Sequence, residues 1–194
     1  MSKPTAGGKR KIKQAARYLV GAPRLVWKFG EVEEEIAWID VMVDSDWAGD
    51  STTRRSTSGG MIVVGGVAIK HWSRTQKGRS LSSCEAEYYA IVTGSAEGLG
   101  VQAMAEEMGW KTKVRVWTDS SGAKSAASKR GLGKMRHIEL KYLWVQEAVQ
   151  RKRVTMKKVL GTLNPADHLT KPQSKKEYEE RLREVGGELR NLSG

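Results

Sequence analysis

Four acidic residues stand at the boundaries of predicted elements, where a folded chain can bring distant side chains together. Asp44 and Asp119 each end an apolar stretch that predicts a strand. Glu87 and Asp167 each lie in the first turn of a predicted helix. Carboxylates in such positions can converge on one edge of a sheet, where their mutual repulsion demands a counter-charge. Because Mg²⁺ and Mn²⁺ prefer oxygen ligands and a metal pair can clamp both reacting oxygens in phosphodiester hydrolysis, the four acids are candidate metal ligands.

The stretch around the first of these acids also fits a plain solvated turn. Asp44 is followed by Asp46 and Asp50, and Asp favours turns. Since Asp44 directly ends the apolar run, we expect it to face the metals and the other two acids to shape the exit of the strand. Alternation along the strand places Asp44 on the same face as Asp40 and Met42.

The composition favours a polyanionic partner. The chain has 194 residues, 39% of them hydrophobic and 29% charged, with a net charge of +12. This positive charge points to nucleic acid, although a membrane surface would also attract it. The single cysteine, Cys84, excludes an internal disulfide and a cysteine-based zinc site. No apolar run approaches the ~18 residues that span a bilayer, so we expect a soluble protein of a reducing compartment.

The hydrophobic pattern predicts a mixed α/β chain with one long central helix. Strand–helix–strand steps after Ser83 imply crossovers and hence a partly parallel sheet. Gly94, Gly98 and Gly100 fall inside the long helix and cost roughly 1 kcal/mol each relative to Ala, which indicates either close packing or a wrong boundary. The expected elements are helix 9–20, strand 25–29, strand 36–44, a hairpin of strands 61–64 and 67–72 around Gly65-Gly66, helix 83–108 with a capping box at Ser82 and Glu85, strand 114–118, helices 120–127 and 137–151, strand 154–160, a helix capped by Asn164, and helix 175–185.

Several motifs carry a resemblance to a known family. They are Asp-Ser-Asp-Trp-Ala-Gly-Asp at 44–50, Arg-Arg-Ser-Thr-Ser-Gly at 54–59, Leu-Ser-Ser-Cys-Glu-Ala-Glu-Tyr at 81–88, Thr-Asp-Ser-Ser at 118–121 and Ala-Asp-His-Leu-Thr-Lys-Pro at 166–172. In order and spacing they resemble the ribonuclease H domain of copia-type LTR retrotransposon polyproteins. Residues 15–23 resemble the helix at the end of the upstream reverse transcriptase region.

The resemblance implies an α/β RNase H-like fold with a five-stranded mixed sheet in the order 3-2-1-4-5 and helices on both faces. It divides the chain into an N-terminal tail and helix (1–35), an RNase H-like domain (36–172) and a charged C-terminal helix and tail (173–194). The implied activity is metal-dependent hydrolysis of the RNA strand of RNA–DNA hybrids during reverse transcription. The implied cofactor is a pair of Mg²⁺ ions, for which Mn²⁺ can substitute.

The family pattern assigns a role to each acid. Asp44 is similar to the acid that bridges both metals, and Asp119 and Asp167 match the third and fourth acids. Glu87 rather than Glu85 matches the second acid, because it occupies the Ala-Glu-Tyr position.

Three departures or absences qualify the resemblance. Many cellular RNases H carry a His in the loop before the fourth acid, and residues 161–165 contain none, which predicts a lower turnover. Cys84 stands where Thr is usual, and we interpret it as a small residue at a helix start rather than a nucleophile. A Tyr-x-Asp-Asp polymerase motif is absent, so this sequence cannot polymerise by itself.

Basic residues near the predicted loops are candidate nucleic-acid contacts, although a solvated basic face is an equally open interpretation. Trp47, beside the acids, is the Trp that we expect to touch substrate, and His71 and His168 are expected to be structural or surface residues. The candidate contacts are Arg54, Arg55, Arg74, Lys77, Arg79, Lys134, Arg136 and His137.

The expected partners are an RNA–DNA hybrid and the upstream reverse transcriptase domain, with no membrane. The expected location is the cytoplasm, including virus-like particles, or the nucleus. Two other interpretations stay open: a catalytically inactive or co-opted nucleic-acid-binding remnant, and a DNA-acting relative of the same fold.

Overall fold

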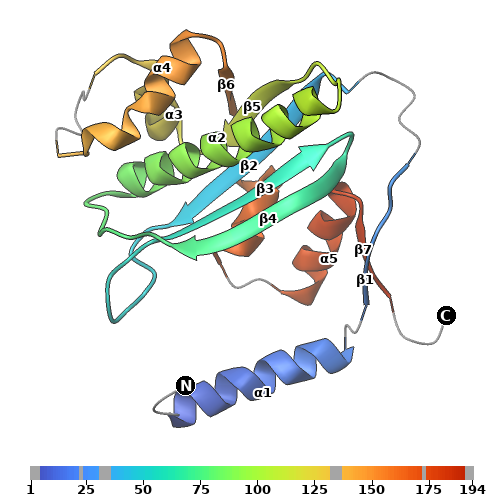
Figure 1. The fold of residues 1–194 in the computed structure, drawn as a ribbon. Coiled ribbons are helices and arrows are strands. Elements are labelled where there is room, and N and C mark those ends of the chain that lie inside the picture. The colour runs from blue at the N-terminus through green and yellow to red at the C-terminus, as the bar shows by residue number, and fades with distance from the viewer. Residues whose placement is uncertain (1–4, 22–23, 31–35, 132–136, 172–173, 191–194) are drawn as a thin grey trace.

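The computed structural model describes residues 5–21, 24–30, 36–131, 137–171 and 174–190 (Figure 1). In chain order its elements are α1 (Ala6–Gly21), β1 (Arg24–Trp27), β2 (Trp38–Asp46), β3 (Thr57–Val64), β4 (Val67–Thr75), α2 (Ser83–Glu107), β5 (Lys113–Thr118), α3 (Ser121–Ser128), η1 (Leu140–Tyr142), α4 (Trp144–Gln150), β6 (Val154–Lys158), η2 (Gly161–Leu163), η3 (Pro165–Leu169), α5 (Lys175–Glu184) and β7 (Gly187–Arg190).

The main sheet has five strands in the order β4-β3-β2-β5-β6. The pairs β2–β3 and β3–β4 are antiparallel, whereas β2–β5 and β5–β6 are parallel. With β2 counted as the first strand, this is the predicted order 3-2-1-4-5, which is confirmed. Figure 1 shows α2 across one face of the sheet and α5 on the other, so helices cover both faces as expected. The hairpin turn has positive φ at both Gly65 and Gly66, which explains why the sequence places two glycines there.

The core between the sheet and α2 depends on two glycines. Val41 and Val43 of β2 are fully buried and face α2. A Cβ atom on Gly94 would lie 2.4 Å from Val43 Cγ1, and one on Gly98 would lie 2.7 Å from Val41 Cγ2. Both glycines therefore allow a close approach of helix and strand, and the predicted helix boundary holds. Gly100 has open space at its Cβ position, so packing gives no reason for it.

Two predicted helices differ from the structure. The expected helix 137–151 begins with extended backbone at Glu139 and becomes η1 followed by α4. Tertiary contacts override the helical pattern, because Ile138 is buried and His137 bonds to α2. The expected helix after Asn164 is the 3-10 helix η3, and its predicted cap is present: the Asn164 side chain accepts a hydrogen bond from Ala166 N.

A second, two-stranded sheet joins a segment near the start of the described chain to its last strand. β1 pairs antiparallel with β7, a strand that the sequence did not predict, with Arg24 opposite Arg190. Ala68 N of β4 donates to Val185 O, 3.0 Å away, which fixes the end of this segment to the main sheet. The sheet thus links residues on either side of the predicted domain, whose boundaries stay a prediction.

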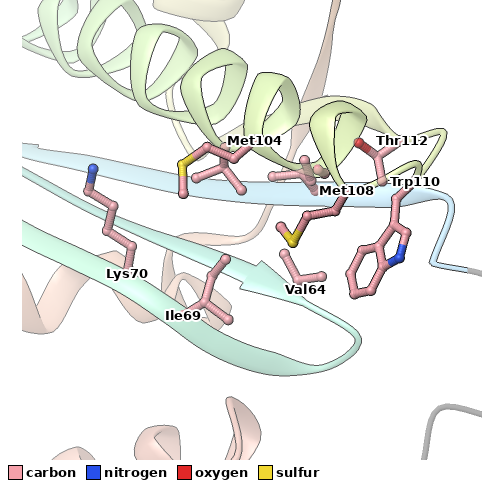
Figure 2. Close-up of a pocket in the computed structure, with 10 residues that line it drawn as sticks. Val64, Ile69, Lys70, Met104, Met108, Trp110 and Thr112 are labelled. Atoms are coloured by element: carbon pink, nitrogen blue, oxygen red, sulfur yellow. The ribbon is translucent and has the colours of Figure 1, made fainter.

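An apolar groove lies at the end of α2 that is far from its first turn. Figure 2 shows Met104 of α2 and Met108, which caps the helix, above Val64 and Ile69 of the hairpin, with Trp110 closing one side. The groove has a volume of about 300 Å³. Within the described residues no helix has both the length and the apolar character that crossing a bilayer requires.

Candidate active site

Three of the four predicted acids meet at one edge of the main sheet. Asp44 lies near the end of β2, and Asp119 directly follows the parallel neighbour β5. Glu87 lies in the second turn of α2, one turn later than expected, because the helix begins at Ser83. One carboxylate oxygen of each residue lies within 4.8 Å of the others, so Asp44, Glu87 and Asp119 could hold a metal ion together.

The fourth predicted acid, Asp167 in η3, lies beside this cluster rather than in it. Its Oδ1 accepts a hydrogen bond from Lys171 Nζ at 2.7 Å. The same ammonium nitrogen lies 3.5 Å from Asp44 Oδ2. Lys171 therefore links Asp167 to the cluster and supplies positive charge to both carboxylates. Sequence reasoning missed this lysine, although it stands in the same motif, four residues after the acid.

Burial makes the cluster electrostatically costly. It raises the pKa of Asp44 to about 6, with hydrogen bonding to Thr170 and the charge of Lys171 acting in the opposite direction. Burial raises the pKa of Glu87 to about 8, and the nearby charges of Asp44 and Asp119 add to the increase. Burial thus favours the protonated forms of Asp44 and Glu87, and a positive charge beside them would favour the ionised forms.

The bonding of Glu87 fits a metal ligand. Its Oε1 accepts from Ser45 N at 3.2 Å, whereas its buried Oε2 has no hydrogen-bond partner in the described part of the chain. An unsatisfied buried carboxylate oxygen is costly, and a hard cation would satisfy it. The donor set, three carboxylates from three elements, is the kind that Mg²⁺ or Mn²⁺ prefers.

Segment 164–171 is attached to the end of β2 by polar contacts. Asn164 Nδ2 donates to Val43 O at 2.9 Å, and the Thr170 hydroxyl donates to Asp44 Oδ2. A Cβ atom on Gly59 would lie 2.7 Å from the Thr170 methyl carbon, so glycine is needed for this close approach. These contacts hold Asp44 in one orientation, and neither partner was predicted.

Glu85, the rejected alternative to Glu87, points away from the cluster. Its carboxylate accepts hydrogen bonds from Leu81 N, the Tyr89 hydroxyl and His137 Nε2. Only one half of the predicted capping box is present, since Ser82 Oγ accepts from Glu85 N but the Glu85 side chain bonds to Leu81 instead.

The candidate nucleic-acid contacts fall into three groups. Arg54, Arg55, Lys77 and Arg79 are exposed on the two loops that leave β2 and β4. Arg79 Nε donates to Thr53 O at 2.9 Å and so joins these loops. The other candidates differ: Arg74 pairs with Glu97, His137 bonds to Glu85, and Lys134 and Arg136 lie outside the described residues.

The remaining singled-out residues have structural partners. Trp47 is half exposed, and its Nε1 donates to Ser80 O at 3.0 Å. Cys84 is partly buried against α3, and burial raises the pKa of its thiol, which fits a packing residue at the helix start. The His168 ring packs edge-on against Tyr178, with the ring centroids 5.8 Å apart.

Comparison with known proteins identifies relatives among retrotransposon polyproteins. The Pol polyprotein of transposon TNT 1-94 from Nicotiana tabacum is 32% identical over 138 residues, which cover 70% of this chain and 10% of the relative. That of transposon RE2 from Arabidopsis thaliana is 30% identical over 191 residues, which cover 96% of this chain and 13% of the relative. The chain thus spans only a small part of these relatives, and no family model matches it.

Solved structures similar to the chain include two of RNase H1. That of Halobacterium salinarum NRC-1 is 17% identical, covers 69% of this chain and 95% of that chain, and gives a TM-score of 0.49. LC11-RNase H1, solved in complex with an RNA/DNA hybrid, is 16% identical. The match covers 68% of this chain and 93% of that chain and gives a TM-score of 0.47.

The sheet order and the helices on both faces define an α/β protein with the RNase H-like fold, as the motifs implied. The three-acid cluster lies at the edge where the parallel strands β2 and β5 end. The chain belongs with the Pol polyproteins of copia-type retrotransposons and corresponds to one region of them.

Proposed function

We propose that the chain is a ribonuclease H-type endonuclease that hydrolyses the RNA strand of RNA–DNA hybrids during retrotransposon reverse transcription. The observation that carries this proposal is the convergence of Asp44, Glu87 and Asp119 from three elements, with Asp44 and Glu87 almost fully buried. Burying repelling carboxylates is destabilising, so their retention at one edge indicates a function in which a cation joins them.

The proposed mechanism assigns separate tasks to the residues around the cluster. Two Mg²⁺ ions, for which Mn²⁺ substitutes, would supply the charge that activates water and stabilises the leaving 3′ oxygen. Asp44, Glu87 and Asp119 would hold these ions, and Asp167 would contribute from the side of the cluster. Thr170 orients the Asp44 carboxylate, and Lys171 neutralises part of the acidic charge while the cations are absent.

Substrate would approach from the loops on the same side of the molecule as the carboxylates. Arg54, Arg55, Lys77 and Arg79 are exposed there and can track phosphates, while the hybrid is recognised by shape and by 2′-hydroxyls. Arg74 is the weakest of the proposed contacts, because Glu97 already pairs with it. The upstream reverse transcriptase domain stays a proposed partner. The proposed location is the cytoplasm, including virus-like particles, or the nucleus.

A cleavage assay tests the proposal. A fluorescent RNA–DNA hybrid would be incubated with Mg²⁺ and the parent, Asp44→Asn, Asp119→Asn or the matched control Asp46→Asn. Asp46 is half-buried two residues beyond Asp44 and lies outside the cluster, so its variant should cleave like the parent. Absence of cleavage by the parent, or equal cleavage by all variants, would overturn the enzymatic function. Preference for duplex DNA would favour a DNA-acting relative instead.

One observation favours a non-catalytic alternative. Lys171 pairs with both Asp167 and Asp44, so an ammonium group already neutralises part of the site. A nucleic-acid-binding remnant needs no metal ion, so it could keep the ion pairs of Lys171 with Asp44 and Asp167 at all times. Hybrid binding that weakens with salt, without metal-dependent cleavage, is the result that this alternative predicts.

A further inference from the structure

The side chain of Glu85 is buried but takes no part in the metal cluster. Its exposed fraction is 2%, close to that of Asp44, yet its carboxylate points to a different set of partners. Leu81 N, the Tyr89 hydroxyl and His137 Nε2 each donate to it at 2.8 Å. These donors come from the loop before α2, from α2 itself and from the segment that precedes η1.

The three donors make an ionised carboxylate tolerable at this position. The three hydrogen bonds satisfy both carboxylate oxygens, since Oε1 accepts from the Tyr89 hydroxyl and Oε2 from Leu81 N and His137 Nε2. The first turn of α2 also favours negative charge through the helix dipole. Glu85 is therefore a charged acceptor that can fix the group that donates to it.

Of the three donors to Glu85, the imidazole of His137 is the farthest away in the sequence. Further contacts hold the same segment against α2: the Tyr88 hydroxyl donates to Tyr142 O at 3.0 Å, and the rings of Tyr89 and Tyr142 pack edge-on with centroids 4.7 Å apart. The His137 side chain nevertheless remains 44% exposed. One ring nitrogen is held by Glu85, and the rest of the ring is accessible beside the first turns of α2.

We infer that Glu85 is a positioning residue, which holds the exposed His137 ring in place as a contact for the nucleic-acid backbone. The inference rests on the proposed function, because it assigns Glu85 to substrate binding at the same site. Glu85 stands two residues from Glu87 in sequence, so a single helix start carries both a candidate metal ligand and the anchor of a substrate contact. Glu85 itself touches neither metal nor substrate and acts through His137.

Steady-state cleavage of the hybrid separates this role from a structural one. His137→Ala should raise KM about tenfold with kcat within about twofold, as expected for a lost charge-assisted contact made equally before and during reaction. Glu85→Gln should raise KM in the same direction. The double variant should be no worse than His137→Ala alone, because Glu85 acts only through that ring.

Tyr89→Phe is the matched control. It removes one hydrogen bond to Glu85 but leaves the contact with His137, so KM should stay within about twofold of the parent even if the melting temperature falls. A purely structural Glu85 would instead lower the melting temperature in both Glu85→Gln and Tyr89→Phe and leave KM unchanged in both.

Hybrid binding distinguishes failure of the inference from failure of the proposed function. If no protein cleaves, fluorescence anisotropy with the intact hybrid still tests the inference, which expects equal weakening by Glu85→Gln, His137→Ala and the double variant. If the parent cleaves but His137→Ala leaves KM and binding unchanged, or the two substitutions act additively, the positioning role is overturned while the nuclease function stands.

Discussion

The two ends of the layer formed by α2 and β2 differ in which side chains are buried: charged groups are buried at one end, and large apolar groups are exposed at the other. At one end, the carboxylates of Asp44 and Glu87 are 1% and 8% exposed. At the other end, Met104, Met108 and Trp110 line the groove of Figure 2 and are 59%, 64% and 50% exposed. Charged groups are rarely buried and large apolar groups are usually covered, so both ends depart from what stability alone favours.

The difference between the ends lies in the support that the chain builds around each. Ser45 N, Thr170 and Lys171 all contact the buried carboxylates. In the described part of the chain, no segment covers the groove side chains to a similar degree. A costly arrangement with its own supporting contacts indicates a built site, whereas an uncovered apolar surface by itself does not identify what it binds. The following predictions test that contrast.

The largest expected effect is the difference in cleavage rate between a substitution in the carboxylate cluster and a substitution in the groove. Glu87→Gln keeps the shape of the side chain but removes a ligand charge, and we expect cleavage to fall by at least about a hundredfold. Met108→Gln at the groove should leave cleavage within about twofold. Initial rates on the hybrid in Mg²⁺ measure both, and similar losses in the two variants would contradict the distinction.

The pH dependence of stability should come from the carboxylate end. The folded protein holds the pKa of Asp44 at about 6 and of Glu87 at about 8, above their ordinary values of 3.8 and 4.5. Between the ordinary and the raised values the folded state binds more protons than the unfolded state, so stability falls as the pH rises. Glu87 should give a slope of up to about 1.4 kcal/mol per pH unit between roughly pH 4.5 and 8.

Denaturant melts of the metal-free protein across this pH range measure the slope. Glu87→Gln should flatten the profile, and added Mg²⁺ or Mn²⁺ should restore stability at pH 8, because a cation that binds only the folded state stabilises it. A profile that is flat in the parent would show that the carboxylates do not carry the expected strain.

The two halves of α2 should respond oppositely to the same substitution. Gly94→Ala places a methyl group against Val43 and should destabilise the protein by about 1–3 kcal/mol. Gly100 is exposed and has open space at its Cβ position, so Gly100→Ala should stabilise the protein by up to about 1 kcal/mol. Denaturant midpoints compare the two variants, and a loss of stability at both positions would mean that helix packing does not differ along α2.

The smallest effect should follow from a polar substitution in the groove. Met104→Lys removes an apolar side chain that is already 59% exposed, so the free energy of unfolding should change by less than about 0.5 kcal/mol. Thermal melts measure this, and a drop of several degrees would show that the groove belongs to the core.

Local sequence signals predicted the strands of the main sheet and the acids at their ends, whereas the strand order and the choice of Glu87 over Glu85 came from the family resemblance. Alternation assigns Val41 and Val43 to one face of β2 and Asp40 and Asp44 to the other. Asp46 falls on the same face as Asp44, so the preference for Asp44 came from its place directly after the apolar run. Parallel strands bring their carboxyl ends to one edge of a sheet, so the sequence predicts that Asp119 and Asp44 lie close together.

The remaining features depend on contacts between residues far apart in the chain. The bond of His137 to Glu85 spans 52 positions and interrupts a segment with a good helical pattern. β7 forms only because β1 lies beside it, so its four residues carry no strong signal of their own. Asp167 likewise lies outside the three-acid cluster and pairs with Lys171, which the order of the acids in the sequence did not indicate.

The pairing of β1 with β7 brings together two strands that stand before and after the main sheet in the chain. Arg24 and Arg190 are opposite each other in an antiparallel pair, so the chain enters and leaves through neighbouring positions. A domain built in this way can be excised, transplanted into a loop of another protein, or circularly permuted with a short linker across its ends.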